Sequence, residues 1–497
     1  MDFSRWIATI SSWIWGWPFI ILCLATGLYY SVRTRFFQIR YIRRMMTLLF
    51  RGKASGSGIS SFQAFVLALS GRVGTGNIAG VATAIALGGP GAVFWMWVIA
   101  FLGAGTAYVE ASLGQIFKEK IDGIYRGGPA YYIFNGLGRK GYAVVFAIVT
   151  IIALGMLMPG VQANAISDAF HTSFALDKRI TAGIVIFLLS LVIFGSVRRI
   201  AGVAEVITPF MAIGYIVIAL IILAVNYRRI PEMFMLIIES AFGIHQALSG
   251  VVGMAVTMGV KRGIFSNEAG QGTAPHAAAA AEVSHPADQG LVQAFSVYVD
   301  TLLICSATAF MILITGMYKV FDSAEATNVV MEGKGLSATM NEYGPVYTQM
   351  AVDTYMPGFG SAFVALALFF FAFTTIMSYY FQAETNVYFL FRKKKTSFYV
   401  VNILRISMLV IIYFTAVNRM TLAWDMADIG VGLMAWFNMI AILLLQSVAL
   451  RTFNDYESQL KSGIRQPLFR PTSLNIRRTK EWSDRNDEKT IATNKRK

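Results

Sequence analysis

Chemically reactive and metal-binding residues are scarce in this chain. Its 497 residues include only two cysteines and four histidines, and charged residues account for 14% of the total. Cys23 and Cys305 both lie inside apolar runs, and the histidines do not have the spacing of a zinc site. The sequence has no phosphate-binding Gly-x-x-x-x-Gly-Lys-Ser/Thr loop and no nucleophile–base constellation. It therefore argues against an enzyme, a disulfide-stabilised protein, a metalloprotein and an ATP-driven pump.

Apolar residues dominate instead. They make up 56% of the chain, and the mean hydropathy is +0.58, whereas charged residues alone make up about 25% of an average soluble domain. Apolar runs of about 20 residues predict membrane-spanning helices. About eleven such runs occur, at roughly 12–31, 60–85, 91–117, 142–170, 180–197, 204–226, 240–283, 292–318, 359–388, 398–416 and 428–450. The sequence predicts an all-α polytopic membrane protein.

Positive charge gathers on one side of these predicted spans. Lys and Arg number 42 against 27 Asp and Glu, a surplus that in a soluble protein would suggest nucleic acid as a partner. Sorted by the predicted spans, 30 of the 42 fall on one side and eight on the other. We expect the richer side to be cytoplasmic, with the N-terminus outside and the C-terminus inside. Seven basic residues follow the first apolar run and mark it as a retained span, not a cleaved signal peptide.

Glycine-rich polar sequence interrupts two of the hydrophobic stretches. The first interruption is Ser-Gly-Arg-Val-Gly-Thr-Gly-Asn-Ile-Ala-Gly at 70–80. The second is Gly-Val-Lys-Arg-Gly-Ile-Phe-Ser-Asn-Glu-Ala-Gly-Gln-Gly at 259–272. A broken helix leaves N–H and C=O groups unpaired at membrane depth, which is tolerated only where protein or a water-filled cavity surrounds them. Interruptions at matching places in two halves are typical of the substrate site of a secondary transporter.

The interruptions also divide the chain. Residues 1–53 hold an additional span and a basic cytoplasmic loop, and residues 54–450 form a ten-span core with halves 60–226 and 240–450. Each half opens with an interrupted helix and has five spans, so the two halves enter the membrane in opposite directions, as inverted repeats do. Residues 451–497 are polar and mixed in charge, and we expect a disordered cytoplasmic tail there.

The first interruption has the features of a zwitterion site. The carboxylate of such a substrate needs N–H donors, and a half-helix that begins after an interruption supplies them together with a favourable dipole. Gly74, Gly76 and Gly80 permit close approach to the backbone, and Thr75 and Asn77 add short polar side chains. Close helix packing is the alternative explanation for the glycines. Because Thr and Asn alternate with them, we favour substrate binding by Thr75, Gly76 and Asn77.

The second interruption combines an aromatic wall, a hydroxyl and a carboxylate, from Phe265, Ser266 and Glu268. A charge at the centre of a span costs about 2.5–3.5 kcal/mol on insertion scales, so Glu268 must be paired or face water. Arg72 is its expected partner, in a pair that either contacts substrate or locks one state of the protein. The basic residues at 261–262 are expected nearer the cytoplasmic end.

A transported cation would need oxygen ligands. Free carbonyls at an interruption supply some of them, and hydroxyls on a neighbouring helix supply others. Thr374, Thr375 and Ser378 fall within an otherwise apolar predicted span. Threonine hydroxyls in membrane helices also bond back to the preceding turn, which is the alternative. Opposite an interrupted helix, we favour the ion site.

Four polar residues within other spans have two explanations each. Gln162 and Asn164 either bind substrate or bridge helices, and substrate binding is favoured for Gln162. Asp300 and Glu110 are lone intramembrane acids. Each is either a proton relay, gate or ion-pair partner, or a buried acid satisfied by its neighbours.

These residues belong to longer strings that resemble the alanine/glycine:cation symporter family, also called sodium:alanine symporters. The strings are Arg72-Val-Gly-Thr-Gly-Asn-Ile-Ala-Gly-Val-Ala-Thr-Ala, Gly89-Pro-Gly-Ala-Val-Phe-Trp-Met-Trp, Arg126-Gly-Gly-Pro-Ala-Tyr-Tyr, Gly263-Ile-Phe-Ser-Asn-Glu-Ala-Gly-Gln-Gly-Thr-Ala-Pro and Asp300-Thr. The resemblance covers most of 12–450. It implies the LeuT-type fold of five-plus-five inverted helices, with broken first and sixth core helices. It also implies import of small neutral amino acids with sodium, or sometimes protons, across a prokaryotic plasma membrane; some members take D-alanine and others favour glutamine.

Carried onto this chain, the resemblance implies a role for particular residues. The substrate carboxylate and amine would be held by Thr75, Gly76 and Asn77, and the pocket would be closed by Gln162, Phe265 and Ser266. The sodium ion would be bound by backbone oxygens near Ser70 and Val73 and by the hydroxyls of Thr374 and Thr375. Members vary at the position of Arg72, so the resemblance gives that residue no shared role.

The sequence therefore predicts a sodium-coupled symporter that imports alanine or glycine by alternating access, with no organic cofactor. One rival is a symporter of the same fold that prefers glutamine or couples to protons through Glu268 or Asp300. A channel is a second rival, and it would not accumulate substrate against a gradient. An amino-acid sensor is a third, and it would need a signalling domain for which the short tail offers no candidate.

Overall fold

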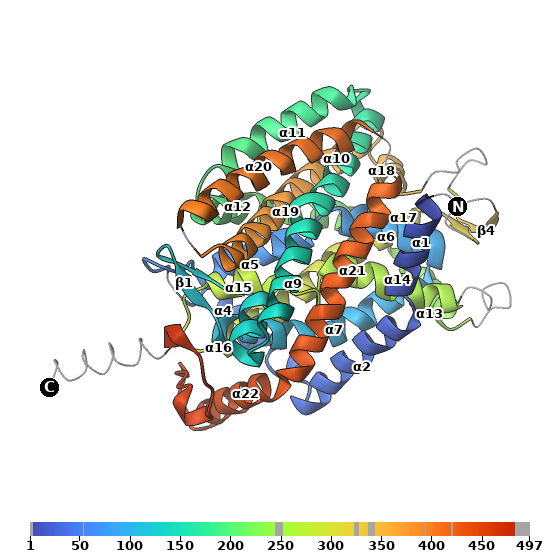
Figure 1. Ribbon diagram of the computed structural model, residues 1–497. Helices are drawn as coiled ribbons and strands as arrows, with labels where there is room; N and C mark the ends of the chain where they lie inside the picture. Colours follow the sequence, from blue (N-terminus) through green and yellow to red (C-terminus); the bar gives the residue numbers. More distant parts are fainter. Residues whose placement is uncertain are drawn as a thin grey trace.

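Helices form nearly all of the regular structure in the computed structural model, which describes residues 3–52, 54–243, 252–322, 328–335, 343–392, 394–418 and 421–482 (Figure 1). In chain order the α-helices are α1 (Phe3–Ile14), α2 (Trp17–Arg33), α3 (Phe37–Arg40), α4 (Ile42–Leu49), α5 (Ser61–Arg72), α6 (Val81–Gly88), α7 (Gly91–Ile116), α8 (Pro129–Tyr132), α9 (Lys140–Ile152), α10 (Met158–Phe174), α11 (Lys178–Ile193), α12 (Val197–Val225), α13 (Ile230–Phe242), α14 (Val252–Asn267), α15 (Ala274–Ala280), α16 (Pro286–Val297), α17 (Ser306–Thr315), α18 (Pro345–Asp353), α19 (Gly360–Leu390), α20 (Lys394–Val417), α21 (Thr421–Leu444) and α22 (Gln446–Lys461). Two antiparallel hairpins pair β1 (Glu119–Ile121) with β2 (Ile124–Arg126) and β3 (Lys319–Phe321) with β4 (Val329–Glu332).

Within the described residues, eight helical segments are long and apolar enough to cross a membrane, and the bent pair α5–α6 makes a ninth. The eight are Thr9–Arg33, Gly91–Ile116, Lys140–Phe174, Val197–Val225, Pro286–Thr315, Gly360–Leu390, Thr396–Val417 and Trp424–Leu444. The other two predicted spans are helical but short, because α11 has 16 residues and α14 is separated from α15. The molecule is thus an all-helical polytopic membrane protein, and the described part of its chain contains eight or nine such spans.

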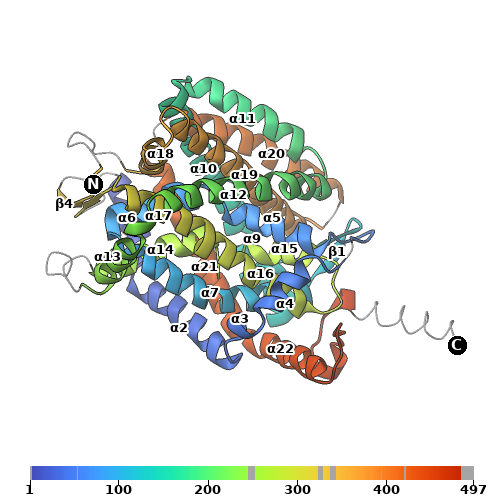
Figure 2. The same ribbon diagram turned by 180° about the vertical axis from the view of Figure 1, so that it is seen from behind.

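The interrupted helices lie in the interior of this bundle. Figures 1 and 2 show α5, α14 and α15 in the middle, with α2 and α7 on one side and α11 and α20 on the other. Nearly every residue of α5 is buried. The outer helices expose large apolar side chains instead, among them Phe187 of α11, Phe210 of α12 and Ile403 of α20. Such surfaces suit contact with lipid, whereas the interior is free to hold polar groups.

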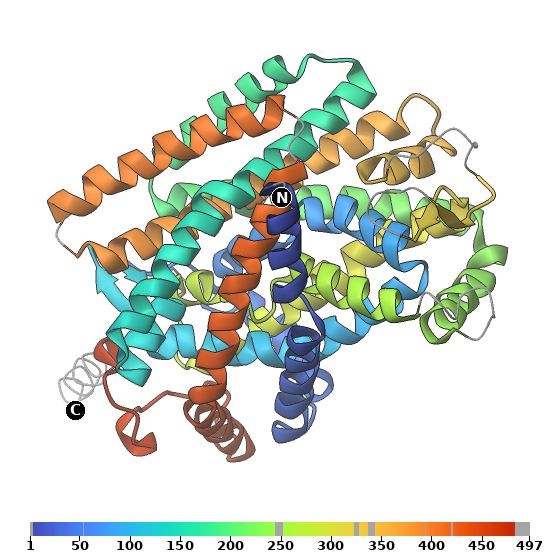
Figure 3. The same cartoon turned by 45° about the vertical axis from the view of Figure 1, so that its right-hand side comes forward.

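The two ends of the bundle differ in chemistry. The basic end, as we call it, carries residues 34–58, the β1–β2 hairpin and α22, and the opposite end carries the N-terminal residues, β3–β4 and α13 (Figure 1). At the opposite end α1 lies alongside α21 (Figure 3). There the indole N–H of Trp15 donates to the Asp428 carbonyl and that of Trp436 to the Ile14 carbonyl, both at 2.9 Å.

The segment after α21 differs from the disordered tail expected at 451–497. It begins with α22, which buries Phe453 and Tyr456 against the bundle. Residues 462–482, which we call the strap, then run back across the basic end. The Phe469 N–H donates to the Ser284 carbonyl at 3.1 Å, and the indole of Trp482 donates to the Gln115 carbonyl at 2.9 Å. A few widely spaced aromatic residues anchor this segment, and its polar composition, from which disorder was predicted, does not show their effect. Residues 483–497 lie outside the described part.

The predicted span 240–283 also has different bounds. Its first residues belong to α13, which ends at Phe242. Residues 244–251 lie outside the described part of the chain. The helix that leads into the second interruption is α14, which is described over Val252–Asn267.

Candidate functional site

The first interruption breaks α5 where the sequence predicts it. The helix ends at Arg72, a π-helical segment spans Gly76–Gly80, and α6 leaves at an angle of 51° to α5. Side-chain amides satisfy the backbone that the break frees. The Gly74 N–H donates to Asn77 Oδ1 at 2.9 Å, and the Thr75 N–H donates to Gln162 Oε1 at 3.0 Å. Gln162 thus reaches the interruption from α10, as expected.

The second interruption spans residues 268–273, between α14 and α15. Glu268, Gly270 and Gly272 all have positive φ, at +55°, +85° and +83°, a region that favours glycine and makes Glu268 an uncommon exception. The Glu110 carboxylate on α7 accepts from the N–H groups of Gly270 and Gly272 at 3.3 and 3.1 Å. Glu110 is therefore a buried acid satisfied by the loop that it holds.

The two interruptions meet at Asp300. Its carboxylate lies in a π-helical segment, Tyr298–Cys305, between α16 and α17. Asn77 Nδ2 donates to Oδ1 at 2.7 Å, and the Ser266 hydroxyl donates to Oδ2 at 3.0 Å. Thr301 adds a third donor at 2.7 Å. One buried carboxylate therefore accepts from both interrupted helices, and among the described residues no basic side chain lies within ion-pair distance of it.

The predicted substrate residues form one buried cluster around this carboxylate. Thr75, Asn77 and Ser266 have no exposed surface. Gly76 allows the approach, because a Cβ there would lie 3.0 Å from Ser266 Cα. The Thr75 hydroxyl is buried and has no hydrogen-bond partner. A buried, unpaired hydroxyl costs about 1–3 kcal/mol, so it is a candidate contact for a ligand.

Phe265 closes the cluster toward the opposite end. Its ring stacks on Trp424 of α21, with centroids 6.3 Å apart and planes at 26°. Beyond it, Lys261 Nζ lies 2.7 Å and Arg262 Nη1 3.6 Å from the Asp428 carboxylate. α14 runs inward from the end opposite to the basic one, so residues 261–262 lie with the N-terminal helix and away from the basic end.

The predicted ion ligands separate into two groups. The Thr375 hydroxyl oxygen lies 2.8 Å from the Ser70 carbonyl, 3.2 Å from that of Val73 and 2.9 Å from that of Phe371. Thr374 does not join them, because its hydroxyl bonds back to the Phe370 and Phe371 carbonyls, both at 3.0 Å. A hydroxyl has one proton, so it can satisfy only one of three carbonyls as a donor. The Thr375 cluster is therefore rich in oxygen lone pairs, as a cation site must be.

Arg72 does not pair with Glu268, contrary to expectation. Among the described residues no ion pair joins them; Arg72 instead donates to the Gln293 carbonyl at 3.0 Å and to the Ser296 hydroxyl. Its Nε and Nη2 groups are buried without partners. The Glu268 carboxylate approaches Gly71, where a Cβ would lie 3.3 Å from Oε2. Both residues lie at the interruptions, but Arg72 at the end of α5 points toward α16, and Glu268 lies in the loop between α14 and α15.

Residues that the sequence did not single out complete the site. Cys305 Sγ lies 3.3 Å from Asn77 Nδ2 and 3.2 Å from the Ser266 hydroxyl. Asn438 on α21 donates to Glu110 at 2.7 Å and to the Gly270 carbonyl at 2.9 Å. A lone amide in an apolar span was the available signal for Asn438. Asn164, in contrast, donates to the Thr415 carbonyl at 3.1 Å and bridges α10 to α20.

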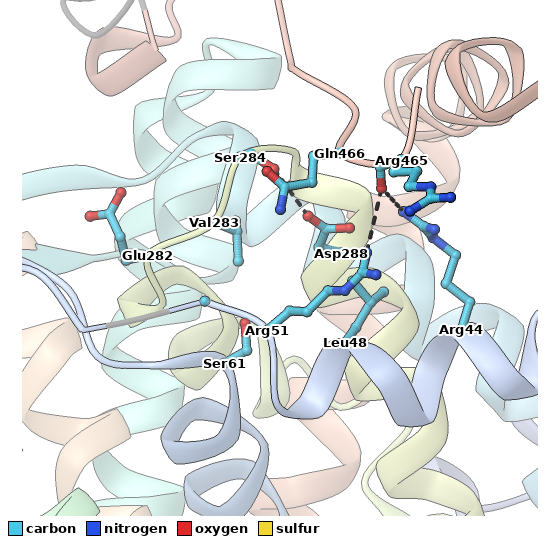
Figure 4. Close-up of a pocket in the computed structure, with 11 residues that line it drawn as sticks. Arg44, Leu48, Arg51, Ser61, Glu282, Val283, Ser284, Asp288, Arg465 and Gln466 are labelled. Atoms are coloured by element: carbon cyan, nitrogen blue, oxygen red, sulfur yellow. Dashed lines mark hydrogen bonds between the residues drawn. The ribbon is translucent and has the colours of Figure 1, made fainter. Parts of the chain in front are cut away.

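The interrupted helices are also joined where they reach the basic end. The Ile59 N–H donates to the Ala280 carbonyl, and the Glu282 N–H donates to the Ile59 carbonyl, both at 2.9 Å. Beside this bridge lies a hollow of about 290 Å³ that includes Ser61 and Ser284 in its lining (Figure 4). The central cluster is thus covered by protein toward both ends of the bundle.

Comparisons with known proteins agree with this geometry. The profile of the sodium:alanine symporter family matches residues 1–471. A putative sodium/proton-dependent alanine carrier protein, YrbD from Bacillus subtilis, is 52% identical over 479 residues, which are 96% of this chain and 97% of that one. A sodium/proton-dependent alanine carrier protein from Bacillus sp. strain PS3 is 48% identical over 88% of this chain and 97% of its own. A probable sodium/glutamine symporter, GlnT from B. subtilis, is 40% identical over 97% and 96%. This chain belongs to the sodium:alanine symporter family, and it is an integral membrane transporter, not an enzyme.

Proposed function

We propose that this protein imports alanine together with sodium by alternating access. The observation that carries the proposal is the meeting of two interrupted helices at one buried acid: Asn77 and Ser266 both donate to Asp300. A polar, irregular site in the middle of an apolar bundle is costly to build. A zwitterion and a cation together supply the charges and hydrogen bonds that such a site lacks.

The substrate would lie against the first interruption. Its carboxylate would lie at the start of the π-helical segment, where the helix dipole favours negative charge, and it would replace the amide oxygens of Asn77 and Gln162 as acceptor for the N–H groups of Gly74 and Thr75. The unpaired Thr75 hydroxyl would donate to it, and the ammonium group would face Asp300. Phe265 would form the wall toward the opposite end. Gly76 and Ser266 approach so closely that a substrate with a small side chain is favoured.

Sodium would bind between α5 and α19. The carbonyls of Ser70 and Val73 and the hydroxyl of Thr375 would be its ligands, because the hydroxyl oxygen already lies 2.8 and 3.2 Å from the two carbonyl oxygens and has a single proton to donate. An ion there would fix the last turn of α5 and the start of the interruption. Substrate would then bind to an ordered site, which gives the coupling a physical basis.

The proposal includes a fold and an orientation. Interruptions in α5–α6 and in α14–α15 would open two five-span halves with inverted topology, and α2 would be an additional span. That arrangement needs eleven crossings, with α11 and the α14–α15 pair each counted as one. The basic end would face the cytoplasm, since Lys and Arg gather there.

Counterflow in proteoliposomes tests the proposal. Vesicles loaded with unlabelled alanine should accumulate external labelled alanine when sodium is present and much less when choline replaces it. Glycine, D-alanine and glutamine in the same assay measure substrate preference. Sodium-dependent exchange of glutamine without exchange of alanine would overturn the substrate assignment, and flux that never exceeds equilibrium would indicate a channel.

A proton-coupled symporter is the second candidate. The specific observation in its favour is the Asp300 carboxylate, which has neutral donors and no basic partner within ion-pair distance among the described residues. A protonated Asp300 side chain is neutral, so the protein could carry the proton through its change of conformation without moving a buried charge. Uptake driven by a pH gradient in sodium-free vesicles would favour this mechanism.

A further inference from the structure

A second hollow at the basic end, of about 590 Å³, is lined by residues 475–478 of the strap, whereas the hollow in Figure 4 is lined by residues 465–466. Four arginines line it: Arg139 before α9, Arg451 on α22, and Arg477 and Arg478 on the strap. All four are exposed to solvent. The strap thus brings together basic residues from three separate segments around one cavity.

No acidic residue lines this hollow. In the described part of the chain, none of the four arginines has a carboxylate within 4 Å, and Arg451 alone donates to protein acceptors, the Ser447 and Leu474 carbonyls. Glu119 on β1 accepts from the lining residue Asn135 at 2.9 Å, but Arg392 and Lys480 already approach its carboxylate at 3.0 and 3.4 Å. Within the described residues, the positive charge of the hollow is therefore not balanced by ion pairs.

The hollow in Figure 4, at the same end of the bundle, is a useful comparison, because its arginines have hydrogen-bond partners and its lining includes an acid; we call it the balanced hollow. Arg44 and Arg51 both donate to the Arg465 carbonyl, at 3.1 and 3.4 Å. Asp288 lies in the same lining and accepts from Tyr456, which in turn accepts from Arg44 at 2.6 Å. Those arginines have partners within the fold, so basic residues at this end are not all alike.

Two residues that line the four-arginine hollow have a left-handed backbone conformation. Asn475 and Arg478 have φ of +50° and +61°, a conformation that costs an ordinary L-residue about 1–2 kcal/mol. The buried Ile476 and Trp482 fasten the strap on either side. The fold therefore keeps Arg478 close to Gly138, whose added Cβ would lie 3.0 Å from the Arg478 guanidinium.

The hollow borders surface that faces lipid. Ile440 and Leu444 lie one turn apart at the end of α21 and are 43% and 62% exposed. Val448, the next residue at that spacing, lines the hollow. Val145 on α9 is 45% exposed nearby. This apolar path lies on α9 and α21, the helices that adjoin Arg139 and the helix that carries Arg451.

We propose that this hollow binds the phosphate headgroup of an anionic phospholipid, whose acyl chains lie along Ile440 and Leu444. Arginine matches a phosphodiester because its planar guanidinium donates two parallel hydrogen bonds to the oxygens. The apolar path favours a lipid over a free phosphate compound, which has the same charged group but no chains. This site is separate from the transport site and goes beyond the proposed function.

Native mass spectrometry of the purified full-length protein tests the site. The probe is phosphatidylglycerol in detergent micelles, with phosphatidylcholine as the neutral comparison. The double variant Arg477→Gln/Arg478→Gln should weaken phosphatidylglycerol adducts about thirtyfold, or roughly fivefold for each arginine near an anionic headgroup. The matched control Arg51→Gln/Arg465→Gln removes the same charge from the balanced hollow and should change binding less than about threefold.

A variant outside the strap and two soluble anions complete the experiment. If the strap variant does not fold, Arg139→Gln, which lies outside the strap, should still weaken the adducts about fivefold. Inorganic phosphate or ATP that binds to the wild type, while phosphatidylglycerol does not, would replace the lipid with a soluble anion and overturn the proposal. Equal losses in the strap variant and its control would reduce the effect to general charge and overturn it as well.

Discussion

The sharpest test of the ion site compares two neighbouring threonines. Thr375→Val keeps the branched shape but removes the hydroxyl that lies 2.8 and 3.2 Å from the Ser70 and Val73 carbonyls. Thr374→Val makes the same chemical change one residue away, where the hydroxyl contacts only the carbonyls of its own helix. Both side chains are fully buried. The pair therefore separates loss of an ion ligand from loss of a buried hydroxyl.

The expected magnitude follows from the number of oxygens. Thr375 is one of the three oxygens that we assign to sodium, and removing one partner of a buried polar group costs about 1–3 kcal/mol. That cost corresponds to an increase of roughly 5- to 150-fold in the sodium concentration for half-maximal uptake. Thr374→Val removes only a bond back to the preceding turn, and its effect on sodium dependence should stay below about threefold.

The sodium concentration for half-maximal uptake is obtained from initial rates of alanine uptake into proteoliposomes as external sodium is varied. Thr375→Val should shift the sodium curve strongly, while at saturating sodium the alanine concentration for half-maximal uptake changes little. Thermal unfolding followed by intrinsic fluorescence checks that both variants fold. An unshifted sodium curve for Thr375→Val, or a larger shift for Thr374→Val, would refute the assignment of these oxygens to sodium.

Two further substitutions address the meeting point of the interruptions. Asp300→Asn keeps the size of the side chain and lets the hydroxyls of Ser266 and Thr301 reverse their hydrogen bonds, so we expect the variant to fold. In a thermal shift assay, its apparent affinity for alanine and sodium should be at least about tenfold weaker, because a negative charge is lost from a buried site that binds cationic groups. Unchanged stabilisation would remove Asp300 from the binding site. Gly76→Ala would place a Cβ 3.0 Å from Ser266 Cα, and overpacking of this kind costs about 1–3 kcal/mol, so uptake and the unfolding temperature should both fall. Gly80→Ala is the matched control, since its nearest neighbour would lie 3.9 Å away, and equal effects of the two changes would contradict the close contact between the interruptions.

Much of the fold follows from local properties of the sequence. Apolar runs of about 20 residues determine membrane-spanning helices because a helix satisfies its backbone hydrogen bonds within one segment, which lipid requires. Glycine and polar residues inside such runs determine where a helix breaks. The first break, at Val73–Gly74, lies within the predicted 70–80, but the second covers only 268–273, because residues 259–267 of the predicted 259–272 continue α14. The Gln162 amide lies at the first interruption, and its contact with substrate stays a prediction. The strap was missed because its few aromatic anchors gain their significance only from the surfaces that they meet.

What the sequence by itself determined is the class of protein and the stretches of the chain in which two of its helices are interrupted. It did not determine which polar residues face one another, because successive residues on a helix point about 100° apart and the rotation of a helix is set by packing. That rotation brings Thr375 and not Thr374 to Ser70, across 305 residues of chain. It also directs Asn77 to Asp300, 223 residues away, and turns Arg72 away from Glu268. The tertiary structure alone decided these contacts, since each depends on how separate helices pack side by side.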